Sequence, residues 1–210
     1  MPHFIYSTVN AGKTLEMLKT AHMYRERGMD VLLAKHALDV RFPGDTIGTR
    51  IGLKRRADFV VSELDLVSEL IEETIEESLE KTGRRRKIDA LFIDEAQFLT
   101  SRQVMDLEVV VDDMDIQAFC YGLRTTYTGQ PFEGSAYLMN TARSIQEISC
   151  ICFCGRKATV NARVENGRIV YRGEPVKIDT LEAQNRGCFY IPLCRKHWKQ
   201  GVYTLSQEVS

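Results

Sequence analysis

The segment Ser7-Thr-Val-Asn-Ala-Gly-Lys-Thr14 lies directly after a short apolar run and decides how the rest of the chain is interpreted. It matches the phosphate-binding pattern G-x-x-x-x-G-K-[ST] except at its first position, where Ser7 replaces glycine. In such a loop the backbone N–H groups and the following helix N-terminus bind phosphate, so side-chain requirements fall mainly on Gly12, Lys13 and Thr14. We therefore expect this segment to bind phosphate. The alternative is an ordinary strand-turn-helix unit, because short patterns also occur by chance.

Composition limits the remaining possibilities. The chain has 210 residues, 44% of them hydrophobic, which predicts one main core with room for a small appendage. Its 28 Lys and Arg residues nearly balance 29 Asp and Glu residues, so a polymeric nucleic-acid partner is disfavoured. There is neither a leader of the secretory type nor an apolar run near the ~20 residues that cross a bilayer, so we expect no membrane association and a cytoplasmic location.

Apolar segments alternate with segments of helical periodicity along the first 150 residues. The alternation predicts a mostly parallel sheet with helices on both faces. We expect a boundary where the sequence changes to short segments rich in turn residues and cysteine, giving domains at 1–148 and 149–210. The expected strands are 3–6, 31–34, 90–93 and 116–121. Two expected helices are 15–27 and 101–111. A third follows a capping box at Ser62-Glu-Leu-Asp65 and has Leu64, Val67, Ile71, Ile75 and Leu79 on its buried face.

An acidic pair, Asp94 and Glu95, ends the apolar segment of Leu91-Phe-Ile-Asp-Glu-Ala-Gln-Phe-Leu99. In a phosphate-loop fold the end of a neighbouring strand faces the same crevice as the loop. Asp94 is then placed to hold Mg²⁺ together with the Thr14 hydroxyl, and Glu95 is available for another task. The alternative is a helix N-terminus stabilised by two acids.

Six cysteines in a reducing compartment favour metal binding or free thiols over disulfides. Cys150, Cys152 and Cys154 alternate, and Cys194-Arg-Lys-His197 follows, which is the spacing of a structural tetrahedral zinc site. In an extended strand the first three would share one face, so the sequence leaves open which two bind, and Cys150 or Cys188 could be a bystander. The alternative is a set of free buried cysteines.

Together these motifs resemble the type II thymidine kinases, most closely the enterobacterial-type members, whose phosphate loop begins with serine as S-x-M-N-A-G-K-S. The resemblance covers nearly the whole chain and implies an α/β, RecA-like phosphate-loop core with a small zinc-binding lasso domain over the nucleoside site. The other matching segments are Asp39-Val-Arg-Phe42, Thr49-Arg-Ile-Gly52, Asp94-Glu-Ala-Gln-Phe98, Tyr121-Gly-Leu-Arg-Thr125 with Tyr127 and Phe132, Ile151-Cys-Phe-Cys-Gly-Arg-Lys157 and Cys194-Arg-Lys-His197.

The resemblance implies an ATP-dependent thymidine kinase that makes dTMP for pyrimidine deoxynucleotide salvage, with deoxyuridine as a further acceptor. It implies a homotetramer and inhibition by dTTP. It makes Glu95 the general base for the nucleoside 5′-hydroxyl. The other implied residues are Ser7, Thr8, Val9, Asn10, Ala11, Gly12, Lys13, Thr14, Asp94 and Gln97 for ATP, with Thr14 and Asp94 for Mg²⁺; Phe98, Leu123, Tyr127, Phe132, Ile178 and Tyr190 for thymidine; and Cys152, Cys154, Cys194 and His197 for zinc.

The sequence departs from that family pattern at two places. The lasso normally reads V-x-I-G-G, whereas Val176-Lys-Ile178 is followed here by Asp179-Thr-Leu-Glu182, and Val9 replaces the methionine of the phosphate loop. An altered nucleoside range is therefore one alternative. Another is a phosphate-loop ATPase whose cysteine-rich part binds DNA or a protein, although Tyr171 is the only aromatic residue in 156–172 that could stack on bases.

Overall fold

The computed structural model describes residues 1–174 and 187–204, and its main feature is a six-stranded sheet of order β5-β2-β6-β7-β1-β8. Every neighbouring pair in this sheet is parallel, as the alternation of strands and helices predicts. The strands are β1 (His3–Ser7), β2 (Val31–His36), β5 (Phe59–Val61), β6 (Ala90–Asp94), β7 (Gln117–Leu123) and β8 (Ser144–Glu147).

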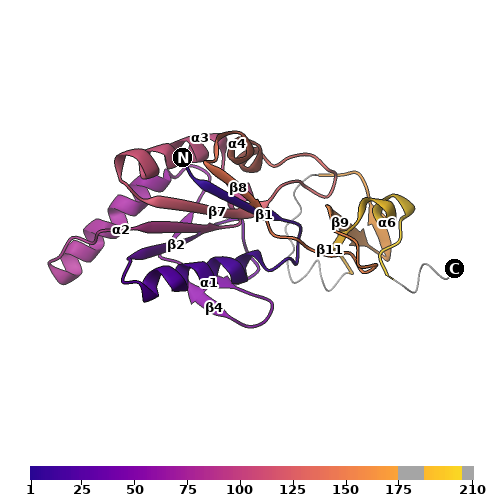
Figure 1. Cartoon of the computed structure of the whole chain (residues 1–210), viewed down its shortest axis with the longest axis horizontal. Coiled ribbons are helices and arrows are strands. Elements are labelled where there is room, and N and C mark those ends of the chain that lie inside the picture. The colour runs from indigo at the N-terminus through magenta and orange to yellow at the C-terminus, as the bar shows by residue number, and fades with distance from the viewer. Residues whose placement is uncertain (175–186, 205–210) are drawn as a thin grey trace.

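Helices cover both faces of the sheet, which confirms the predicted layers (Figure 1). Helix α1 (Lys13–Glu26) lies on one face, and α2 (Val67–Thr82), α3 (Ser101–Glu108) and α4 (Glu133–Thr141) lie on the other. Successive strand residues alternate between the two cores: Phe4, Leu32 and Leu91 belong to the core under α2, α3 and α4, while Ile5, Leu33 and Phe92 pack with α1. Burial on both faces explains why these strands are uninterrupted apolar runs.

Because all six strands are parallel, their carboxyl ends meet at one edge of the sheet. Ser7, His36, Asp94 and Leu123 close β1, β2, β6 and β7 at this edge. From the sequence we expect the acidic strand β6 to be a neighbour of β1. In the structure β7 lies between them. The acidic pair therefore faces the phosphate loop across one intervening strand.

Two element boundaries differ from the prediction. Helix α2 begins at Val67 without a side-chain cap, and Leu64, expected on its buried face, is 84% exposed. The Asp65 carboxylate instead accepts a hydrogen bond from the Ser62 N–H at 2.7 Å, which closes a turn before the helix. A true capping box occurs at Thr100 of α3. That helix ends at Glu108 and continues as the π-helical turn η2 (Val109–Asp113).

A short hairpin and a 3₁₀ turn lie beside the large sheet. Strands β3 (Thr46–Gly48) and β4 (Lys54–Arg56) form an antiparallel hairpin that the sequence did not indicate. The 3₁₀ turn η1 (Ala96–Phe98) follows β6 directly. Both elements border the edge at which the parallel strands end.

The chain leaves the large sheet after β8 and builds a separate antiparallel sheet of order β10-β9-β11. Its strands are β9 (Val160–Glu165), β10 (Arg168–Val170) and β11 (Phe189–Leu193), and α6 (Arg195–Gln200) follows (Figure 1). This part has its own small core, which includes Ala162, Val164 and Leu193. The division into independent domains at residue 148 stays a prediction.

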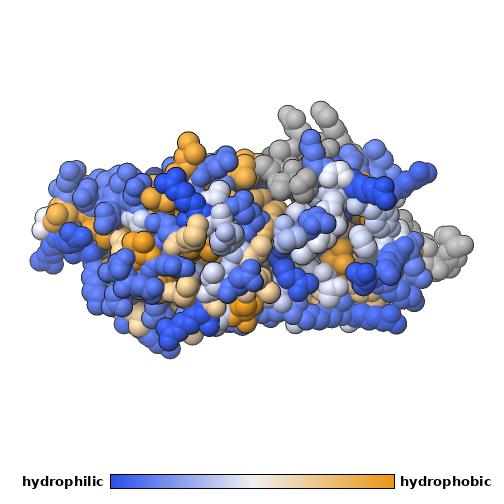
Figure 2. Space-filling view, turned by 90° about the horizontal axis from the view of Figure 1, so that it is seen from above, coloured by the Kyte–Doolittle hydropathy of each residue, from blue (hydrophilic) through white to orange (hydrophobic). Residues whose placement is uncertain are grey.

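Within residues 1–174 and 187–204, no helix combines the length and the apolar character that crossing a membrane requires. On the face shown in Figure 2, hydrophilic residues predominate and hydrophobic residues occur in small groups.

Candidate functional site

A cavity of about 850 Å³ lies at the edge where the parallel strands end. Its walls come from the phosphate loop, the segment after β6, the segment after β7, and strand β11 of the small sheet. Most residues singled out from the sequence meet there. Those that line it are Val9, Asn10, Ala11, Gly12, Lys13, Thr14, Glu95, Gln97, Phe98, Leu123, Tyr127, Phe132 and Tyr190.

The phosphate loop joins β1 to α1 and has the conformation that its sequence predicts. Gly12 caps α1 with a φ of 82°, a left-handed conformation that a side chain would strain. Lys13 is buried, and its ammonium group donates to the Thr8 carbonyl at 3.0 Å. Burial lowers the pKa of Lys13, and the charges of Glu95 and Asp94 oppose that shift. The loop thus holds a buried cation at the N-terminus of α1.

Ser7, the residue that departs from the general phosphate-loop pattern, does not line the cavity. Its hydroxyl donates to the Ile148 carbonyl at 2.5 Å, so it ties the end of β1 to the segment after β8. Serine at this position therefore has a structural contact that glycine would lack.

Thr14 and Asp94 form a buried pair beneath the loop. The Thr14 hydroxyl donates to Oδ2 of Asp94 at 2.8 Å, and Asp94 has no exposed surface. Burial and the neighbouring Glu95 charge raise the pKa of Asp94 to about 7. A hydroxyl and a carboxylate side by side are the oxygen donors that Mg²⁺ prefers, so the pair fits this ion.

Glu95 is held in an uncommon backbone conformation, with a φ of 54°. Such strain costs about 1 to 3 kcal/mol and persists where surrounding contacts enforce it. The Gln97 amide donates to Oε2 of Glu95 at 2.5 Å, and the Gln97 carbonyl oxygen accepts from the Leu123 N–H at 2.9 Å. A Cβ atom on Gly122 would lie only 2.9 Å from Oε1 of Gln97, so glycine leaves the space that Gln97 occupies.

Arg41 contacts Glu95 from the segment after β2, and we did not assign it a role from the sequence. Its guanidinium lies 2.6 Å from Oε1 of Glu95 and also binds Asp39 through two hydrogen bonds of 2.7 and 3.1 Å. The fully buried Lys35 ammonium donates to the carbonyls of Phe42 and Thr46 and lies 3.9 Å from Asp39. The segment Asp39-Val-Arg-Phe42, quoted above as a family match, was the signal for this network.

Aromatic side chains form the other end of the cavity. Phe98 and Phe132 meet edge to face with ring centroids 5.9 Å apart, and Tyr127 and Tyr190 meet at 6.3 Å. The Tyr127 hydroxyl donates to the Glu174 carbonyl at 3.0 Å. Flat apolar walls of this kind suit a planar ring. Ile178, expected here, lies outside the described residues.

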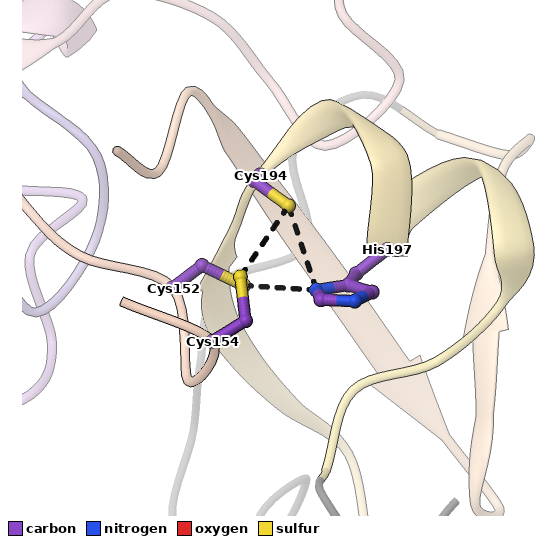
Figure 3. Close-up of side chains that lie close together, drawn as sticks. All are labelled: Cys152, Cys154, Cys194 and His197. Carbon is purple, nitrogen blue, oxygen red and sulfur yellow. Dashed lines mark hydrogen bonds between the residues drawn. The ribbon is translucent and has the colours of Figure 1, made fainter. Parts of the chain in front are cut away.

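Four side chains that could bind a metal ion converge beside the small sheet (Figure 3). Cys152 and Cys154 lie in a turn, and Cys194 and His197 lie at the start of α6. Their ligand atoms lie within 4.8 Å of one another, with Cys154 and Cys194 sulfurs 3.9 Å apart and each of two sulfurs 3.5 Å from Nδ1 of His197. Zinc–sulfur bonds of about 2.3 Å in a tetrahedron place sulfurs roughly 3.8 Å apart, so the cluster could hold such an ion.

Cys150 does not join this cluster. Residues 150–158 form a tight turn, closed by the Cys152 N–H to the Arg156 carbonyl at 2.8 Å, and not the extended strand that would place three cysteines on one face. The Cys150 sulfur instead lies 3.9 Å from the Val9 carbonyl. Cys188 also lies apart, 3.3 Å from Nε of Arg163.

Comparison with known proteins agrees with this geometry. The sequence model of the family described as "Thymidine kinase" matches residues 2–198. A thymidine kinase of Francisella tularensis is 39% identical over 201 residues, covering 96% of this chain and 98% of that one. A thymidine kinase of Legionella pneumophila is 41% identical over 200 residues (95% and 89%), and one of Streptococcus agalactiae is 38% identical over 197 residues (93% and 95%). The chain therefore belongs to the thymidine kinase family.

Proposed function

We propose that this chain transfers the γ-phosphate of ATP to the 5′-hydroxyl of thymidine, giving dTMP, with deoxyuridine as a further acceptor. The observation that carries the proposal is one cavity shared by the phosphate loop, Glu95 and the aromatic walls, with the Thr14–Asp94 pair buried beneath the loop. Membership of the thymidine kinase family supports the nucleoside assignment. Across this cavity, the phosphate loop would bind the phosphate donor, the Glu95 carboxylate would accept the proton, and the aromatic walls would bind the nucleoside.

The charges of the cavity suit phosphoryl transfer. Catalysis of this reaction depends on alignment and on neutralising the transferred group, more than on a special nucleophile. We assign phosphate binding to Lys13 and to N–H groups of the loop, and Arg41 adds a second cation beside Glu95. Mg²⁺, when bound with ATP, would supply further positive charge, and the Thr14 hydroxyl and Asp94 carboxylate are the groups that would hold it.

Glu95 is the group that we assign as general base. The Gln97 amide and Arg41 each bind one of its carboxylate oxygens, so its orientation is fixed between the phosphate loop and the aromatic walls. A base positioned in this way contributes typically ~10² to 10⁴-fold to rate. Each of these contacts uses one lone pair, so the carboxylate keeps a free lone pair on which Glu95 accepts the 5′-hydroxyl proton.

Structural zinc is the ion that we assign to the Cys152, Cys154, Cys194 and His197 cluster. Four protein ligands leave no open position for substrate, so the ion would stabilise the fold and not take part in the reaction. It would pin α6 to the turn at 152–155 and thereby hold β11, which carries Tyr190 into the cavity. Inhibition by dTTP, a homotetrameric state and a cytoplasmic location complete the proposal.

A coupled ADP-release assay with thymidine, deoxyuridine, deoxycytidine or DNA tests the reaction. We expect turnover with thymidine, weaker turnover with deoxyuridine, and none that depends on DNA. Glu95→Gln should reduce the rate ~10²-fold or more while ATP binding, measured by calorimetry, persists. ATP turnover that requires DNA and ignores nucleosides would defeat the proposal, and full activity of Glu95→Gln would remove its role as base.

A further inference from the structure

One buried amide connects the two halves of the cavity. Asn161 lies on β9 of the small sheet, is 3% exposed, and borders the cavity. Its Oδ1 accepts a hydrogen bond from the Val9 N–H at 2.8 Å, and its Nδ2 donates to the Thr125 carbonyl at 2.7 Å. Three segments that are far apart in the sequence thus meet at one side chain.

The two contacts reach opposite functional parts of the site. Val9 belongs to the phosphate loop after β1, and Thr125 follows β7 at the base of the turn that carries Tyr127. Two backbone hydrogen bonds join its two ends, from the Thr126 N–H to the Gln130 carbonyl at 2.8 Å and from the Gly129 N–H to the Thr126 carbonyl at 3.1 Å. A change in the aromatic end of the cavity would therefore be transmitted to Asn161 and from there to the phosphate loop.

The Asn161 amide can form both hydrogen bonds only in one orientation. An amide accepts with its oxygen and donates with its nitrogen at the same time, and here only one orientation satisfies both neighbours. Breaking either bond leaves a backbone group unpaired in a nearly buried position, which is costly. A second contact, from Nδ2 of Asn10 to the Tyr190 carbonyl at 3.4 Å, also runs between the phosphate loop and the small sheet.

We propose that Asn161 is a positioning residue that couples nucleoside binding to ATP binding. Nucleoside contact with the aromatic walls orders the turn at 125–130, and Asn161 transfers that order to the Val9 backbone. The second ligand then meets a phosphate loop that is already ordered and binds more tightly. This coupling rests on the proposed function, because it presumes that the two ends of the cavity take ATP and thymidine.

Titration calorimetry with a non-hydrolysable ATP analogue, in the presence and absence of thymidine, tests the coupling. We expect thymidine to lower the Kd of the analogue about 5-fold or more in the unchanged chain, as is typical of coupled sites. Asn161→Leu keeps the side chain's size and removes both hydrogen bonds, so the ratio of the two Kd values should fall to within about twofold of one. The test uses the ratio of the Kd values of the ATP analogue without and with thymidine. A substitution that changes both Kd values by the same factor leaves this ratio unchanged.

Two further variants keep the result decisive. Asn161→Asp still accepts from the Val9 N–H but cannot donate to the Thr125 carbonyl, so it should also lose the coupling even if Asn161→Leu folds poorly. Asn140→Ala, on the exposed side of α4, should keep the ratio of the unchanged chain. Metal content and thermal unfolding of each variant report whether the fold is intact.

The outcomes separate this inference from the proposed function. Thymidine phosphorylation by the unchanged chain, together with an unchanged Kd ratio in both Asn161 variants, would overturn the coupling alone. A ratio of one in the unchanged chain would overturn it too. Absence of any thymidine phosphorylation would overturn the proposed function and the coupling with it.

Discussion

The guanidinium of Arg41 lies 2.6 Å from Oε1 of Glu95, so the residue assigned as general base forms an ion pair with a cation from another strand end. The same guanidinium also binds the Asp39 carboxylate, so side chains that follow two different strands form one charged network. Arg41 thus holds one carboxylate oxygen of Glu95, while the Gln97 amide holds the other.

Arg41→Met should lower kcat about 10²-fold and move the acid limb of the kcat/KM profile to higher pH. Asp94 must be ionised to hold Mg²⁺, and its pKa is raised to about 7 by burial and by Glu95, while the Arg41 charge opposes the rise. Removing Arg41 therefore raises this pKa further, and activity is lost at a higher pH as the solution is acidified. Rates at saturating and limiting ATP between pH 5.5 and 9 measure both effects. Arg55→Met, on the exposed strand β4, should leave the profile in place, and an unmoved limb in Arg41→Met would contradict the network.

Asp94→Asn should abolish magnesium-dependent activity but stabilise the empty protein, more at pH 8 than at pH 5.5. The folded-state pKa of Asp94, about 7, lies above its ordinary value of 3.8, so the folded chain binds more protons between these values. Stability of the unchanged chain consequently falls as the pH rises through that window, by about 1.4 kcal/mol per pH unit at most. Asparagine stays neutral and avoids this loss. Urea unfolding without added magnesium, with the exposed Asp112→Asn as control, measures the difference, and equal effects at both pH values would contradict the assignment.

Gly122→Ala should reduce kcat about 10-fold or more through Gln97. The new Cβ atom would lie 2.9 Å from Oε1 and 3.0 Å from the backbone nitrogen of Gln97, which must move and release Oε2 of Glu95. Gly83→Ala is the matched control, since its φ of 70° costs about 1 kcal/mol of stability but nothing lies within 4 Å of its Cβ. Steady-state kinetics beside thermal unfolding separate the two effects. Comparable kcat values for both folded variants would show that Gln97 does not orient Glu95.

Cys152→Ser should remove the bound metal and lower Tm by about 5–10 °C, because the cluster loses one of four ligands that hold the small sheet to α6. Cys150→Ser should retain one zinc ion per chain, because this thiol lies outside the cluster. Elemental analysis after gel filtration gives the metal content of each variant. Loss of metal in Cys150→Ser and its retention in Cys152→Ser would reverse the ligand assignment.

The layers of the fold could be predicted from the sequence because the central strands contain buried apolar runs, such as Ala90–Ile93 before Asp94 in β6. The start of α2 could not, because Ser62 and Asp65 have the residue types of a capping box but form a turn instead. Local pattern alone does not distinguish the two uses of a serine and an acid three residues apart.

The site was predictable where it follows local motifs and not where it depends on distant contacts. Lys13, Thr14 and the four residues of the Cys152, Cys154, Cys194 and His197 cluster belong to motifs with fixed spacing. Asn161 lies in an unremarkable strand, and only the three-dimensional structure brings it to Val9. Cys150 was ambiguous because the turn at 150–158 could not be foreseen from alternating cysteines.

Strand β7 separates β1 from β6, and this arrangement sets the reach of the reaction. Neighbouring strands lie about 4.8 Å apart, so the ends of β1 and β6 are held roughly 10 Å from each other by backbone hydrogen bonds. Side chains bridge this span, because the Thr14 hydroxyl after β1 reaches the Asp94 carboxylate at the end of β6. The aromatic walls lie on other segments, so substitutions there would leave the spacing between the phosphate loop and the acidic strand unchanged.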